Sequence, residues 1–112
     1  MKLFWCWRCQ RDMPMLDEVE FAPISRLYSE CTDSTKKLRQ EKGLTFEQTP
    51  IDAMFEPVRL EYERLTGFVN CHQDAVMHHR ASLYGPPCHV CRKPLRTSKA
   101  RHCASCGAQR AQ

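Results

Sequence analysis

The sequence predicts a mainly α protein in which a small helical domain is flanked by cysteine pairs. Three observations support this fold class. Apolar residues recur at helical spacing through the middle of the chain, six of the eight cysteines occur in Cys-x-x-Cys pairs, and all acidic residues precede position 75. We expect an amino-terminal Cys-x-x-Cys segment at 1–16, a helical body at 17–83 and a zinc-ribbon tail with four cysteines at 84–112.

Length and composition restrict the classes of protein that the chain can represent. With 112 residues it suits one compact domain, and its 42% hydrophobic content includes eight cysteines, so the apolar core is thin and a further cross-link would help. No apolar run is long enough to cross a bilayer, and the amino terminus lacks the small-residue cleavage site of a signal peptide. The composition therefore predicts a cytoplasmic protein without a membrane partner.

The first elements of the chain can be predicted from local signals. Residues 1–16 are expected to form a short extended or turn segment around a metal knuckle. A long helix should follow, because Asp17 and Glu20 have the spacing of a capping box. Pro23 is predicted in its first turn and Gly43 at its end. The apolar face of this helix comprises Ile24, Leu27, Tyr28, Cys31 and Leu38.

The rest of the body contains signals for two further helical stretches. The first is predicted to begin with Thr49 as its cap and Pro50 at the first helical position. Pro57 should kink this stretch or divide it into two short helices before Gly67. A third, shorter helix is expected from Asn70 through HQDAVMHHRASL, and the following YGPP marks the entry to the tail.

Two Cys-x-x-Cys pairs in the tail are the strongest functional signal. Cys88 and Cys91 are followed, after eleven intervening residues, by Cys103 and Cys106. Two such knuckles brought face to face supply four thiolates to one tetrahedral zinc ion, and Gly107 gives the second turn its backbone freedom. The lack of an export signal favours metal over disulfides. We therefore predict a structural zinc site.

Cys6 and Cys9 form half of a second site. Three pairs supply six thiolates and two tetrahedral sites need eight ligands, so two further residues are required. Adjacent His78 and His79 point to different sides of a helix, so at most one should join the pair, and we assign His78. Alternatively, the amino-terminal pair docks on the tail and exchanges with one of its knuckles. The candidates for the two missing ligands are Cys31, Cys71, His72, His78 and His79.

The sequence does not predict an enzyme or a small-molecule substrate. FWCWRC is superficially like a thioredoxin-type motif, but only five residues precede Cys6 and no βαβ pattern surrounds it. PCHVC matches half of a zinc deaminase motif, but the His-x-Glu half is missing and four cysteines leave no position for an activated water. A metal-dependent nuclease would need its histidines between the knuckles. A redox-active dithiol at Cys6 and Cys9 is a further class.

Charge is divided unevenly along the chain. Residues 75–112 carry 7 Lys+Arg and no acid, whereas residues 1–74 carry 10 Lys+Arg and 13 Asp+Glu. A metal site bound by four thiolates is negatively charged, and the surrounding Lys and Arg residues compensate it, which explains part of the positive excess. Against nucleic-acid binding, the tail has a single aromatic residue, Tyr84, on which a base could stack. For these basic residues we favour an acidic protein partner over sequence-independent phosphate contacts. The predicted contact residues are Arg92, Lys93, Arg96, Lys99 and Arg101.

Two stretches, FWCWRCQRDMPMLDEVEF and MHHRASLYGPPCHVCRKPLRTSKARHCASCG, resemble small bacterial zinc-ribbon proteins of unassigned activity. Gln10 and Arg92 depart from the glycine that usually follows such knuckles. The resemblance brings no catalytic residues. By analogy with small bacterial proteins dedicated to one partner, it implies a non-enzymatic protein-binding module, most sharply an immunity protein that neutralises a toxin. The alternative is a nucleic-acid-binding or transcription-associated zinc ribbon.

Overall fold

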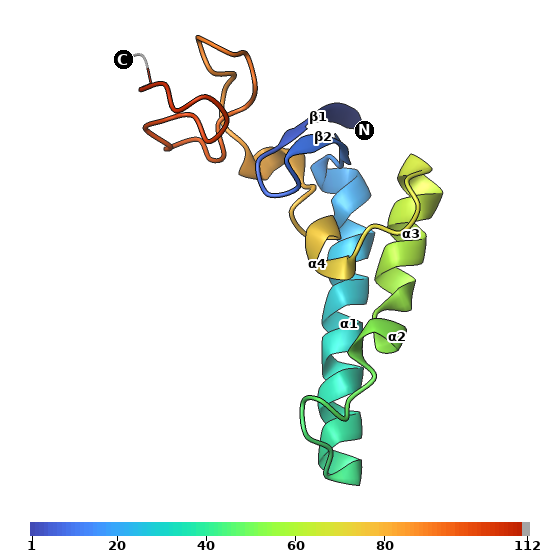
Figure 1. Ribbon diagram of the computed structural model, residues 1–112. Helices are drawn as coiled ribbons and strands as arrows, with labels where there is room; N and C mark the ends of the chain where they lie inside the picture. The colour runs from blue at the N-terminus through green and yellow to red at the C-terminus, as the bar shows by residue number, and fades with distance from the viewer. Residues whose placement is uncertain (111–112) are drawn as a thin grey trace.

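The computed structural model describes residues 1–110. The molecule is elongated, 53 × 27 × 20 Å, with the tail and an amino-terminal hairpin at one end and the end of a long helix at the other (Figure 1). In chain order, the elements are β1 (Lys2–Cys6), β2 (Arg11–Met15), α1 (Glu18–Lys42), α2 (Ile51–Met54), α3 (Glu56–Thr66), α4 (Gln73–Val76) and the 3-10 turn η1 (Ala81–Leu83).

The prediction of a mainly α fold is wrong. The chain has 43% helix and 15% strand, and forms a small mixed α/β domain with a two-stranded antiparallel sheet. The sheet pairs β1 with β2, from Lys2 opposite Met15 to Cys6 opposite Arg11. Residues 13–16 are all buried. Because both faces of β2 are covered, this strand lacks the alternation of polar and apolar residues by which a strand is usually predicted.

Helix α1 begins as the sequence predicts. The Asp17 carboxylate accepts the Glu20 N–H at 2.8 Å, and the Glu20 carboxylate accepts the Asp17 N–H at 3.0 Å, so the capping box is confirmed. Gly43 ends the helix at φ 60°, also as predicted. Pro23 lies one turn further into the helix than predicted, because the first helical residue is Glu18. It leaves the Val19 carbonyl without its usual helical donor.

Removing the Asp17 cap should destabilise the protein measurably. We expect Asp17→Ala to lower the free energy of unfolding by about 1 kcal/mol, because one backbone donor of the first turn loses its acceptor. Thermal unfolding of the metal-loaded protein, followed by circular dichroism, tests this. Asp33→Ala, at an exposed position in the same helix, is the control and should cost less. If the two substitutions lowered the free energy of unfolding equally, the role assigned to the Asp17 cap would be wrong.

The second helical stretch is divided into two helices next to Pro57. This is one of the two outcomes that the sequence predicts, the other being a kink. Helix α2 ends at Met54 and α3 begins at Glu56, with Pro57 in the first turn of α3. The prediction that Thr49 caps α2 is wrong. Its hydroxyl donates to the Thr45 carbonyl at 2.7 Å and so stabilises the preceding turn instead.

The third predicted helix is much shorter than expected. Only one α-helical turn, α4, and the separate 3-10 turn η1 form within the predicted range. The chain leaves the helix after Val76 because the backbone near His79 pairs with Leu16. The Leu16 N–H donates to the His79 carbonyl at 2.8 Å, and the Ala81 N–H donates to the Leu16 carbonyl at 2.9 Å. Pairing with the amino-terminal segment therefore replaces helical hydrogen bonds.

One apolar core joins the hairpin to the helices, and a second, smaller core lies in the tail. Tyr62 is fully buried, and its hydroxyl donates to the Pro14 carbonyl at 2.6 Å, which ties α3 to β2. Within residues 1–110, no helix has the length and apolarity needed to span a bilayer. The main core also includes Met13, Met15, Leu16, Phe21, Ile24, Phe55, Val58 and Val76, and the tail core comprises Cys88, Leu95, Ala100 and Cys103.

The first residues of the tail pack against its own later segment at Gly85. The Gly85 N–H donates to the Leu95 carbonyl at 2.8 Å, and a Cβ at this position would lie 2.2 Å from the Thr97 carbonyl oxygen. Two backbone segments therefore approach each other here more closely than any side chain would allow.

Candidate metal centres

All three Cys-x-x-Cys pairs form the same backbone turn. The residue after the second cysteine has a left-handed φ in each, 58° at Gln10, 69° at Arg92 and 79° at Gly107. Its N–H donates to the carbonyl of the first cysteine of the pair at 2.8–2.9 Å. The absence of glycine at Gln10 and Arg92 therefore does not change the turn, although each position carries the steric cost of a side chain in this conformation.

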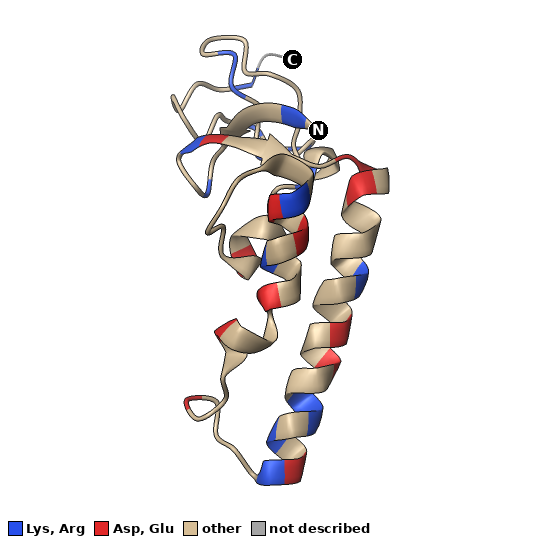
Figure 2. Cartoon of the chain, turned by 90° about the vertical axis from the view of Figure 1, so that its right-hand side faces the viewer, with Lys and Arg blue, Asp and Glu red and all other residues tan. Residues whose placement is uncertain are grey.

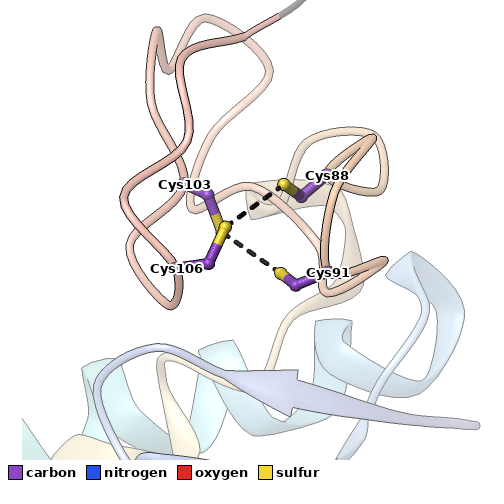
Figure 3. A group of neighbouring side chains, drawn as sticks. All are labelled: Cys88, Cys91, Cys103 and Cys106. Atoms are coloured by element: carbon purple, nitrogen blue, oxygen red, sulfur yellow. Dashed lines mark hydrogen bonds between the residues drawn. The ribbon is translucent and has the colours of Figure 1, made fainter.

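The tail brings together the four cysteines that the sequence predicts, and we call this group the ribbon centre: Cys88, Cys91, Cys103 and Cys106. Their sulfur atoms all lie within 4.8 Å of one another and converge from two turns (Figure 3). The Cys88–Cys106 and Cys91–Cys103 sulfurs are 3.7 and 3.5 Å apart. Tetrahedral coordination with metal–sulfur bonds of about 2.3 Å separates sulfurs by about 3.8 Å. Disulfide sulfurs are only about 2 Å apart. The group could therefore hold a metal ion.

Backbone groups favour thiolates in the ribbon centre. Burial opposes ionisation of Cys103, but the N–H groups of Cys106 and Ser105 outweigh it and lower the pKa of Cys103 to about 6. At Cys106, the Ala108 N–H favours the thiolate, but desolvation and hydrogen bonding with the other thiols raise its pKa to about 11. Without a cation, the four groups cannot all ionise, because their negative charges repel one another.

A second group, which we call the hairpin centre, comprises Cys6, Cys9 and His79. Its three ligand atoms lie within 4.8 Å of one another, and the Cys9 sulfur is 3.3 Å from His79 Nε2. Cys6 and His79 are fully buried, whereas Cys9 is half-buried. Burial opposes ionisation of Cys6, but hydrogen bonds with His79 and Tyr84 lower its pKa to about 6. Burial and the Cys6 charge raise the pKa of Cys9 to about 11.

His79, rather than His78, lies beside the amino-terminal pair. His78 is only half-buried, and its carbonyl accepts the Tyr84 hydroxyl at 2.8 Å. Adjacent residues do point in different directions here, but the sequence alone gave no means of choosing between them. Pairing of the His79 backbone with Leu16, which is tertiary, decides the choice.

The other candidate ligands are distributed as follows. Cys71 is buried, with its sulfur 3.8 Å from His79 Nδ1. Cys31 lies in the main core, and His72 caps α4 and contacts Asp52 at 3.3 Å. Among the described residues, the amino-terminal pair groups with His79 and not with a tail knuckle, which gives no support to an exchange of knuckles.

The five basic residues predicted to contact a partner divide into two sets. Lys93 and Arg96 contact tryptophans of the hairpin, with the Lys93 ammonium 4.9 Å from the Trp5 ring and the Arg96 guanidinium 5.5 Å from the Trp7 ring. These contacts attach the tail to the hairpin and bring aromatic rings to a tail that has few of its own. The remaining three are exposed, as Arg96 also is, and within residues 1–110 they contact no aromatic ring: Arg92, Lys99 and Arg101.

A groove that the sequence does not reveal lies on the body, between α1 and the segment formed by residues 44–55. Its volume is about 800 Å³, and residues of α4 also line it. Phe46, in its wall, is 63% exposed. The groove forms because residues after Gly43 turn back along α1 (Figure 1). We call it the body groove.

Comparisons of the chain with protein-family models, with curated proteins and with solved structures found no match.

Proposed function

We propose that the protein is a non-enzymatic, zinc-stabilised module that binds another protein through the body groove. In its most specific form, the proposal is that the protein is a cytoplasmic bacterial immunity protein, which neutralises a toxin by covering the active site of the toxin. The observation that carries the proposal is the groove itself, because it is large, open and lined by both apolar and charged side chains.

The lining of the groove resembles a protein interface in its arrangement. Tyr28, Phe46 and Phe55 give it apolar surface, and Lys36 and Asp52 add charges of both signs. Apolar centres with polar rims are typical of protein interfaces, and exposed aromatic residues often contribute most of the binding energy. Phe46 is the expected anchor, because its ring is 63% exposed in the groove wall and lies 5.8 Å from the Arg39 guanidinium.

The metal centres support binding rather than catalysis. In the ribbon centre, four thiolates would fill the coordination sphere of a zinc ion and leave no position for a reacting water. Zinc would then stiffen the protein, and a rigid surface binds a partner with less loss of conformational entropy.

The charge of the body suits a basic partner. Residues 17–74 carry 12 Asp+Glu and 7 Lys+Arg, whereas the flanking segments are basic (Figure 2). Toxins that degrade nucleic acid need positive charge to bind phosphates, so an acidic body would attract such a toxin and increase its rate of association.

A photo-crosslinking amino acid at position 46 tests the proposed surface. In cells producing the protein, it should form an adduct with one specific protein, and the same group at Val19, which is 83% exposed and outside the groove, should not. With the purified partner, Phe46→Ala should weaken binding by about 30-fold, the loss typical of a hot spot, and Val19→Ala should leave it unchanged.

Equal crosslinking at the two positions, or an unchanged affinity for Phe46→Ala, would contradict this use of the groove. Purified partner should also lose its own activity on binding if the immunity form is correct.

Nucleic-acid binding is the second candidate, and one observation favours it. Trp7 is half-buried between the guanidiniums of Arg8 and Arg96, at 4.7 and 5.5 Å, next to the basic tail. Proteins that bind single-stranded nucleic acid combine aromatic rings, on which bases stack, with nearby positive charges. In this protein, guanidiniums already contact the ring. Co-purified nucleic acid that dissociates steeply as salt rises would favour this candidate over a protein partner.

A further inference from the structure

We propose that Cys71 is the fourth ligand of a second zinc ion, bound at the hairpin centre by Cys6, Cys9 and His79. The three residues already close together supply three ligand atoms. Structural zinc takes four, and the two fully buried ligands leave little room for water to act as the fourth.

The Cys71 thiol lies next to His79, although its sulfur is outside the group of three ligand atoms that are within 4.8 Å of one another. It is 5% exposed, and its sulfur lies 3.8 Å from His79 Nδ1. Within residues 1–110, His79 is the only hydrogen-bonding neighbour that this sulfur has. A buried thiol beside two other thiols and a buried imidazole is a typical set of zinc ligands.

The backbone before Cys71 provides independent support. In the described part of the chain, only three residues other than glycine have a positive φ: Gln10, Asn70 and Arg92. Gln10 and Arg92 directly follow a cysteine of a metal centre, and Asn70, at φ 62°, directly precedes Cys71. Such a conformation costs about 1 kcal/mol even where asparagine eases it, and strained residues cluster at functional sites. The strain at Asn70 is accounted for if Cys71 must face the centre.

The break in the helix between Cys71 and His79 also brings the Cys71 side chain toward the hairpin centre. In the continuous helix that the sequence suggested, two residues eight positions apart would be separated by about 12 Å along the axis. With only the single turn of α4 between them, the two side chains instead meet.

Helix α4 is held firmly in this arrangement by Gln73, which is 2% exposed. Its side-chain amide donates to the Asp52 carboxylate at 2.9 Å and its carbonyl accepts from the Arg59 guanidinium at 2.7 Å. The segment between Cys71 and His79 is therefore fixed by the contacts of Gln73 as well as by those of its two end residues.

Completion of the site requires a small adjustment. The Cys71 sulfur is near Nδ1 of His79, whereas the Cys9 sulfur is near Nε2, and one ring nitrogen alone can bind the ion. The proposal requires that rotation about the single side-chain torsion of Cys71 bring its sulfur toward the other two. If Cys71 instead only accepted the Nδ1 proton, it would orient the histidine without touching the metal.

Cadmium-113 NMR of the cadmium-loaded protein separates these two roles. We expect two resonances from the unmodified chain, one at the shift of four thiolates and one at the shift of three thiolates with one nitrogen. In Cys71→Ser the second resonance should move or vanish while the first stays. Cys31→Ser, at another buried cysteine outside both centres, is the matched control and should leave both unchanged.

The spectrum of the unmodified chain decides the question even if Cys71→Ser fails to fold. A second resonance at the shift of two thiolates and one nitrogen would overturn the assignment of Cys71. A single bound cadmium per chain would overturn the hairpin centre as a metal site.

Discussion

Replacing Cys103 with serine is expected to unfold the tail while the helical body stays folded. Within residues 84–110, the tail core has four buried residues, and two of them are cysteines of the ribbon centre. A segment of this size rarely folds without a metal or a disulfide. Binding of a structural zinc ion to a small peptide contributes about 10–16 kcal/mol, so its loss removes far more free energy than the remaining contacts supply.

Three measurements check this expectation. Bound zinc should fall by one ion per chain, amide NMR signals of the tail should collapse to unfolded positions, and helical circular dichroism should persist. Ala104→Ser, at an exposed position between the two cysteines, is the control and should change none of these. Retention of the full zinc content by Cys103→Ser would refute the ribbon centre, and unfolding of the body would show that the tail is not independent.

Tyr62→Ala should be the most damaging single change in the body. The side chain is completely buried among the hairpin and helices, and its ring centre lies 5.5 Å from that of His79. Truncation of a buried aromatic residue costs about 3–5 kcal/mol through lost burial and the remaining cavity. Tyr62→Phe keeps the ring but leaves the Pro14 carbonyl without its donor, which should cost about 1–3 kcal/mol.

Urea unfolding of the metal-loaded variants measures both losses. Leu60→Ala, on the same helix but 53% exposed, should cost less than either. If Tyr62→Phe proved as stable as the unmodified protein, the hydrogen bond from α3 to β2 would have no net effect. A loss for Leu60→Ala as large as that for Tyr62→Ala would mean that burial does not explain the effect.

The features that could be predicted from the sequence depend on residues close together in the chain. The Asp17 cap and the Gly43 terminus of α1 require only a few neighbouring residues. The convergence of the ribbon cysteines requires only two short turns and the connection between them. In each case local backbone geometry almost determines the outcome.

The features that could not be predicted depend on contacts between distant segments. The hairpin lacked a strand pattern because Met13 and its neighbours are covered on both faces. The choice of His79 over His78 depends on pairing with Leu16, and Trp7 meets Arg96 only after the tail packs on the hairpin. Charge along the chain likewise gave no indication that Lys93 and Arg96 would serve as internal contacts.

If both centres bind metal, the separation of their residues along the chain sets an order of metal loading. In the ribbon centre, Cys91 and Cys103 are 12 positions apart, whereas Cys9 and His79 in the hairpin centre are 70 apart. Closing the longer loop costs about 1.6 kcal/mol more in chain entropy, and it also requires most of the body to lie between its ends. A newly made chain would therefore bind metal in the tail early and at the hairpin last. An ion retained at the hairpin centre would then report that the whole body has folded.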